Sequence, residues 1–171
     1  MINQFSSIYT DGTADSMTPL TALSMYDQFR ELTPVGRRGD RIIQRLADRL
    51  VEVDLLDRAS VLLDRQVKFR LRGKQKAIVG SKLALIRLLD RQPRLALDAL
   101  NESVSPGLDS RLALERKRLR SRSVFELGDS ESALKLIKND DSRKADLLRA
   151  DIYWRTQDWE RSALIYQRLI G

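Results

Sequence analysis

The feature that most constrains the fold is a pair of small residues twelve positions apart, which recurs four times along the chain. The pairs are Ala47 and Ala59, Ala84 and Ala96, Ser121 and Ala133, and Ala150 and Ser162. Successive pairs follow one another after 37, 37 and 29 residues. Antiparallel helices pack closely only where small side chains meet. The spacing therefore predicts four helix pairs, each with a small residue late in its first helix and early in its second.

Each pair is followed, four positions after its second member, by a large apolar residue. These residues are Leu63, Leu100, Ile137 and Tyr166. We expect them to fill the groove between one helix pair and the next. Units of this kind bury their apolar faces by stacking on their neighbours.

The chain has few residues that break helices. Only eight Gly and four Pro occur in 171 residues, and this favours long helices over many short strands. Apolar residues at helical spacing mark the segments 41–56, 58–69, 78–90, 95–103, 114–127, 131–138, 143–155 and 159–170. The sequence thus predicts an all-α fold.

The N-terminal part divides at Thr18-Pro19, where a cap and a first-turn proline predict the start of a helix over 18–32. That helix ends at the breaker Thr33-Pro34-Val35-Gly36. We therefore expect a flexible polar tail over 1–17, an N-terminal helix with its turn over 18–36, and a helical repeat domain over 37–171.

The repeat resembles the tetratricopeptide repeat family, whose pattern has a small residue in the first helix, another twelve later and a large one four beyond that. The last unit matches best, with Ala150, Tyr153, Ser162, Tyr166 and Leu169. The resemblance covers about residues 39–170. It implies a right-handed α-solenoid of about four antiparallel helix pairs.

The turn inside each pair departs from the family pattern. The family's turn glycine is present only as Gly128, and Asp54, Arg91 and Gln157 stand at the other three positions. The run RELTPVGRRGDRIIQRLADRLVEVDLL is also similar to the C-terminal region of large proteobacterial proteins with many such repeats. Neither resemblance implies an activity.

Composition excludes several classes of site. The chain has no Cys and no His, which excludes disulfides, thiolate zinc sites, histidine metal sites and serine–histidine triads. No phosphate loop or dinucleotide fingerprint occurs. Pairs of acidic residues for hydrolysis are not excluded by spacing, but most carboxylates lie one helical turn from Arg or Lys. We expect no enzyme, no catalytic residue, no cofactor and no metal.

The run Asn139-Asp140-Asp141-Ser142 is better explained as a helix stop and cap than as a calcium loop.

The net charge is +7, and the basic excess lies beyond residue 36. Two clusters stand out: Lys68, Arg70, Arg72, Lys74 and Lys76, then Arg111, Arg116, Lys117, Arg118, Arg120 and Arg122. One interpretation is a surface for an anionic ligand: nucleic-acid phosphates, lipid headgroups or an acidic peptide. The other, which we favour, is a solvated face that keeps the protein soluble, since aromatic residues for base stacking are few.

The family's groove is lined by first-helix residues that point away from the core of each pair. Mapped onto this chain, the best candidate group is Arg118, Arg122, Phe125, Trp154 and Arg155. Guanidinium groups there would pair with a carboxylate while the rings hold an apolar side chain. Arg41, Gln44, Ser81 and Leu85 complete the predicted partner-binding set. For Phe125 and Trp154 the alternative is ordinary core packing.

We therefore expect a scaffold that binds a protein or peptide, of acidic character, through a helical-repeat groove. The alternatives are a basic nucleic-acid-binding repeat protein and a fragment of a larger scaffold with no activity of its own. The last helix is apolar to its end, with Ile165, Tyr166, Leu169 and Ile170. This indicates further sequence, a homodimer contact or a docked partner helix. No secretory signal or membrane span is evident, so we expect a cytoplasmic protein.

Overall fold

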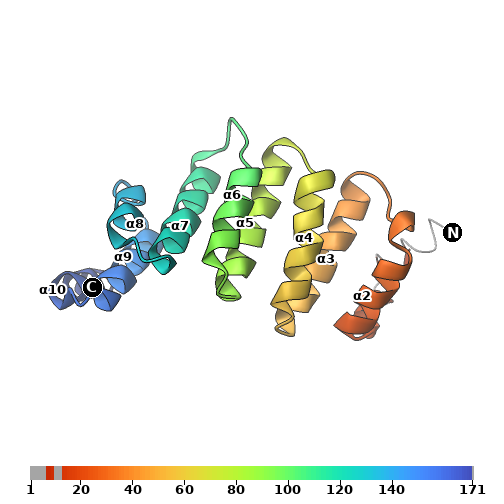
Figure 1. Ribbon diagram of the computed structural model, residues 1–171, viewed down its shortest axis with the longest axis horizontal. Coiled ribbons are helices and arrows are strands. Elements are labelled where there is room, and N and C mark those ends of the chain that lie inside the picture. The colour runs from red at the N-terminus through yellow and green to blue at the C-terminus, as the bar shows by residue number, and fades with distance from the viewer. Residues whose placement is uncertain (1–6, 10–12, 171) are drawn as a thin grey trace.

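The computed structural model describes residues 7–9 and 13–170 of the chain. All regular secondary structure in these ranges is helical and no strand is present, which confirms the predicted all-α class. The helices follow one another in a row, from α2 near the N-terminus to α10 at the other end (Figure 1). No helix in the described ranges has the length and apolar character that crossing a membrane requires.

Four pairs of consecutive helices make up most of the row. They are α3 (Arg37–Glu52) with α4 (Leu56–Phe69), α5 (Gly73–Leu89) with α6 (Pro93–Glu102), α7 (Ser110–Glu126) with α8 (Ser130–Leu136), and α9 (Arg143–Arg155) with α10 (Trp159–Ile170). Before them come the 3-10 turn η1 (Ala14–Ser16), the helix α2 (Pro19–Gln28) and the 3-10 turn η2 (Arg30–Leu32). The helix expected over 18–32 is thus α2 followed by η2.

The eight small residues of the repeat all lie inside the helix pairs. Seven of them have no exposed surface and Ser162 is 1% exposed. Leu63, Leu100 and Ile137 are buried as well. Tyr166 is 41% exposed, because no described helix packs on that face of α10. The predicted pairing around small residues is therefore present in all four units.

The turn inside each pair has the same geometry four times. Asp54, Arg91, Gly128 and Gln157 all adopt left-handed backbone conformations, with φ of 60°, 55°, 98° and 65°. In each turn, the N–H of the next residue donates to the carbonyl five positions earlier, at 2.8, 2.7, 3.2 and 2.8 Å. This is the 6→1 hydrogen bond of a Schellman motif, which satisfies a carbonyl at the helix end. One backbone device therefore closes every first helix, with glycine in only one of the four.

The contact between α5 and α6 depends on a glycine. A Cβ atom on Gly80 would lie 2.0 Å from the hydroxyl oxygen and 2.2 Å from the Cβ of Ser103. Arg116 of α7 closes this junction, since its guanidinium donates to the carbonyl oxygens of Ala77 (2.8 Å) and Leu100 (2.6 Å) and to the Ser103 hydroxyl (3.2 Å). Burial lowers the pKa of Arg116, and the nearby Arg120 adds to that effect.

The segment expected to be a flexible tail is packed where the structure describes it. Residues 1–6 and 10–12 lie outside the described part of the chain. Tyr9 is 5% exposed, its hydroxyl donates to the carbonyl of Ala22 at 2.8 Å, and its ring meets Tyr26 edge-on at 6.5 Å. Arg49 of α3 donates to the carbonyl of Ala14 at 2.6 Å. A buried aromatic ring and two hydrogen bonds from side chains to backbone carbonyls thus join this segment to α2 and α3.

Candidate partner-binding site

A groove of about 500 Å³ runs across the first helices of three successive pairs. It is lined from α5 by Leu85, Leu88 and Leu89, from α7 by Glu115, Arg118, Leu119 and Arg122, and from α9 by Lys144, Leu147 and Leu148. We call it the leucine groove. In each helix the lining residues are three or four positions apart, so each helix turns one face toward the groove. Because α7 contacts both α5 and α9, the three faces adjoin.

The floor of the leucine groove is apolar and accessible. Leu85, Leu89 and Leu147 are 47%, 58% and 45% exposed. Scattered exposed leucines are common on protein surfaces, but leucines from three helices that meet in one concavity are typical of a binding site. The groove can therefore take up the apolar side chains of a partner.

The cationic rim of the groove is partly fixed by carboxylates. Arg118 donates to Asp140 at 2.6 Å and to the Ser142 hydroxyl at 3.3 Å. Arg122 pairs with Asp151 at 2.5 Å and with Glu126 at 2.9 Å. Burial would raise the pKa of Asp140, but hydrogen bonds from Ser142 and Arg118 outweigh it and lower that pKa. Both guanidinium groups are thus held in place.

Two further charges in the groove have no such partner. Lys144 and Glu115 make no side-chain hydrogen bond or ion pair to any residue in the described part of the chain. Lys144 belongs to the first turn of α9, beside the exposed Leu147. A carboxylate on a partner would therefore meet an ammonium group that is free to bind it.

Phe125 lies in the core and not on the groove. Its ring is 7% exposed and packs with Ala133 and Ile152. The guanidinium of Arg155 covers the ring at 4.4 Å from its centroid and donates to both carboxylate oxygens of Glu126, at 2.7 and 3.1 Å. The hydrogen bonds from Arg155 hold the pKa of Glu126 below its usual range. Phe125 thus packs in the core and Arg155 makes an internal ion pair, while the expectation that they receive a partner stays a prediction.

The other predicted site residues lie in different places. Trp154 is 56% exposed and contacts Trp159 edge-on, with ring centroids 4.6 Å apart, outside the leucine groove. Ser81 is 2% exposed and accepts a hydrogen bond from Arg116 at 3.1 Å. Arg41 and Gln44 line a separate hollow of about 560 Å³ on α3. Of the predicted set, the structure brings together Leu85, Arg118 and Arg122.

The sequence reasoning missed Leu89, Lys144 and Leu147. Leu89 follows Leu85 by one helical turn, Leu147 precedes Ala150 by three residues as Arg118 precedes Ser121, and Lys144 lies one turn before Leu147. Extending the spacing of each first helix by one turn would have found them. The signal was therefore present in the sequence.

Five of the eleven side chains in the two basic clusters pair with carboxylates of the described chain. Lys68 pairs with Asp64 at 2.8 Å, Lys74 with Asp109 at 2.7 Å and Arg70 with Asp40 at 2.9 Å. Hydrogen bonding to Asp64 raises the pKa of Lys68. In the second cluster Arg116 is buried against carbonyls, and Arg118 and Arg122 are paired. These contacts favour a structural role for the clusters over a phosphate-binding surface.

The acidic residues of the described ranges gather in no group of three suited to a metal ion. The run over 139–142 caps the next helix, as predicted, since the Ser142 hydroxyl accepts a hydrogen bond from the N–H of Ala145 at 3.3 Å, whereas α8 already ends at Leu136. The neighbouring Asp140 accepts from Arg118 and from the Ser142 N–H. Its carboxylate is therefore already occupied.

Comparison of the chain with protein families, curated proteins and solved structures finds no match. The resemblance to tetratricopeptide repeats rests on the small-residue pairs, the turn positions and their spacing.

Proposed function

We propose that this chain is a tetratricopeptide-like, right-handed α-solenoid that binds an apolar, acidic peptide segment of a partner protein in the leucine groove. Four helix pairs with the same buried small residues and the same Schellman turn support the repeat architecture. Solenoids of stacked helix pairs commonly bind partners on the surface formed by equivalent helices. A cytoplasmic scaffold with no reaction of its own is part of this proposal.

The observation that carries the proposal is the leucine groove itself, to which α5, α7 and α9 each contribute one face. Each of these helices is the first of its pair, so the groove follows from the repeat. Its length across three helices suits an extended or helical segment better than a small molecule. The exposed leucines would lose their contact with water on binding, which is favourable by roughly 25 cal/mol per Å² of apolar surface.

The charges of the groove indicate what else the segment carries. Arg118, Arg122 and Lys144 face it, against the single carboxylate of Glu115. Lys144 is unpaired among the described residues and Arg122 is 40% exposed. An acidic side chain placed beside a leucine or phenylalanine of the partner would match this arrangement.

Peptide display on the immobilised chain tests the proposal, followed by affinity measurement for the selected peptides by fluorescence anisotropy. We expect the selected peptides to combine apolar and acidic residues. Leu89→Glu should weaken their binding about tenfold or more, because it removes a leucine contact and adds a like charge. Val61→Glu is the matched control, since Val61 is 50% exposed on α4 and lies outside the groove. Equal effects of the two substitutions would refute the proposal.

A further inference from the structure

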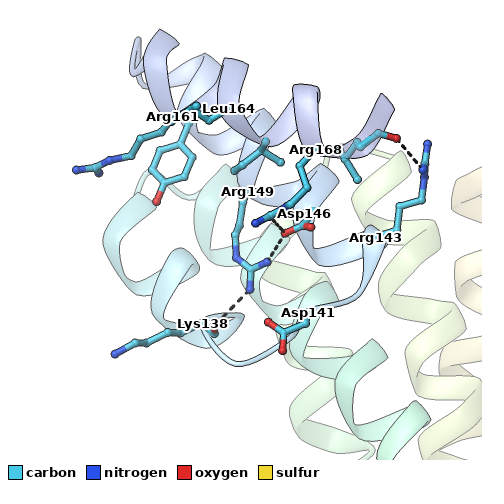
Figure 2. Close-up of a pocket in the computed structure, with 11 residues that line it drawn as sticks. Lys138, Asp141, Arg143, Asp146, Arg149, Arg161, Leu164 and Arg168 are labelled. Carbon is cyan, nitrogen blue, oxygen red and sulfur yellow. Dashed lines mark hydrogen bonds and ion pairs between the residues drawn. The ribbon is translucent and has the colours of Figure 1, made fainter. Parts of the chain in front are cut away.

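A second groove, of about 740 Å³, lies between α9, α10 and the loop over 137–142 (Figure 2). Five cationic side chains line it: Lys138, Arg143, Arg149, Arg161 and Arg168. Only two carboxylates line it, those of Asp141 and Asp146. We call it the arginine groove.

The arginine groove and the leucine groove lie on opposite sides of α9. Asp146, Arg149 and Tyr153 face the arginine groove, whereas Lys144 and Leu148 face the leucine groove. Each residue of an α-helix turns by about 100°, so positions 144 and 146 point about 200° apart. One helix therefore separates two independent surfaces.

The arginine groove exists because α8 is short. This helix has 7 residues, whereas α4, α6 and α10 have 14, 10 and 12. Arg149 donates to the backbone carbonyls of Ile137 and Asp140, and these hydrogen bonds satisfy acceptors in the loop just beyond α8. Because α8 ends after only two turns, α9 begins soon after it, and the flank of α9 and α10 remains uncovered. The shorter α8 accounts for three of the eight residues by which the last repeat spacing falls short of 37, and the earlier position of Ala150 in α9 accounts for four more.

The floor of the arginine groove keeps a positive excess. Asp146 is 8% exposed and accepts from both Arg149 and Arg168, each at 2.7 Å (Figure 2). Arg143 donates to the carbonyl of Leu169 at 3.0 Å and pairs with no carboxylate in the described ranges. The Lys138 ammonium makes no hydrogen bond or ion pair to a described residue. Two cations are thus available to an incoming anion.

The walls of the groove favour a peptide over nucleic acid. Leu164 is 59% exposed along one side, which offers an apolar contact beside the cations. The ring of Tyr153 is covered by Arg161 at 5.5 Å from its centroid. No open aromatic ring of the described residues in this groove is therefore left for a base to stack on.

We propose that the arginine groove binds an acidic segment of a partner protein, with carboxylates at Lys138, Arg143 and Arg168 and an apolar side chain on Leu164. Because this surface lies opposite the leucine groove, the chain can hold two segments at once. This inference does not depend on what the leucine groove binds.

A fluorescein-labelled oligoglutamate peptide tests the proposal, with binding followed by fluorescence anisotropy. We expect affinity to fall as salt is added and to fall about tenfold in the double variant Lys138→Glu/Arg143→Glu. Lys138→Glu alone should give a smaller loss, and it changes an exposed side chain that supports no described contact. Replacing one glutamate of the probe by leucine should strengthen binding.

The double variant Lys117→Glu/Lys135→Glu is the matched control, because both lysines are exposed and lie outside the two grooves. It should bind nearly as tightly as the native chain. Equal loss in both double variants would show non-specific attraction and overturn the proposal. Displacement of the probe by oligothymidylate at equal charge concentration would overturn it in favour of a nucleic-acid surface. Leu89→Glu should leave probe binding unchanged, so failure of this site is distinguishable from failure of the leucine groove.

Discussion

The hydroxyl of Ser121 on α7 donates a hydrogen bond of 2.7 Å to the carbonyl oxygen of Ala133 on α8. In the last pair the direction is reversed, and Ser162 on α10 donates to the carbonyl of Ala150 on α9 at 3.0 Å. Both bonds join the two small residues that are twelve positions apart. The repeat spacing is therefore a direct helix-to-helix contact, in which serine adds a hydrogen bond to the close packing.

Ser121→Ala should lower the free energy of unfolding by about 1 kcal/mol, because it removes this buried hydrogen bond while keeping the small volume. Ser121→Leu should cost more, since a large side chain would force α7 and α8 apart. Chemical denaturation measures both. Ser110→Ala, at an exposed position in the same helix, is the control and should change little. A Ser121→Leu variant as stable as the native chain would contradict the assigned contact.

At the four left-handed turn positions, introducing glycine and removing glycine should have opposite effects on stability. Arg91→Gly and Gln157→Gly should stabilise the chain by about 0.5–1 kcal/mol, because glycine adopts positive φ without steric cost. Gly128→Ala should destabilise it by about 1–2 kcal/mol. A Cβ at Gly128 would meet nothing within 4 Å, so that loss would come from the backbone conformation alone. Thermal melting of the three variants checks the signs, and a neutral Gly128→Ala would count against the turn geometry.

Gly80→Ala should destabilise the chain by about 2 kcal/mol, through the clash with Ser103. The sign of this change in stability is informative, because exchanging glycine for alanine within an exposed helix stabilises the helix by about 1 kcal/mol. Adding Ser103→Gly to the variant should restore part of the loss, because it removes both clashing atoms. If Gly80→Ala melts at a higher temperature than the native chain, α5 and α6 do not approach as described.

Stability should fall in acid partly through Asp140. Its pKa is lowered in the folded chain by hydrogen bonds from Ser142 and Arg118, which outweigh its burial. Such a group stabilises the fold above its unfolded pKa of about 3.9, and this contribution disappears as pH falls through the folded value. Asp140→Asn should therefore cost about 3 kcal/mol at pH 7 and flatten the fall in stability below about pH 4. Asp141→Asn, an exposed neighbour, is the control.

Most of the scaffold could be predicted from the sequence, because burial requires small residues at fixed spacing. The segments predicted over 143–155 and 159–170 coincide with α9 and α10. By contrast, α5 begins at Gly73 and not at residue 78, since its first turn is basic and shows no apolar period. The short α8 was predicted over 131–138, within two residues of its bounds at each end, but the hydrogen bonds of Arg149 to the carbonyls just beyond it were not, because they join residues nine and twelve positions apart.

The candidate site was harder to predict from the sequence, because a shift of one position along a helix changes the side that a residue faces. Leu85 and Arg122, each directly after the first small residue of its pair, lie on the groove face. Phe125, one turn after Ser121, shares the buried face of that serine. Ser81, three residues before Ala84, is buried for the same reason. Counting from the small residues would have separated groove positions from core positions.

Amide NMR spectra of the labelled chain, recorded while a display-selected peptide is added, test the leucine groove most directly. The largest shift changes should fall on Leu85, Leu89, Lys144 and Leu147, whereas Val61 and the residues of α10 should change little. Shift changes concentrated on α10 or on the hollow of α3, with the leucine groove unaffected, would contradict it.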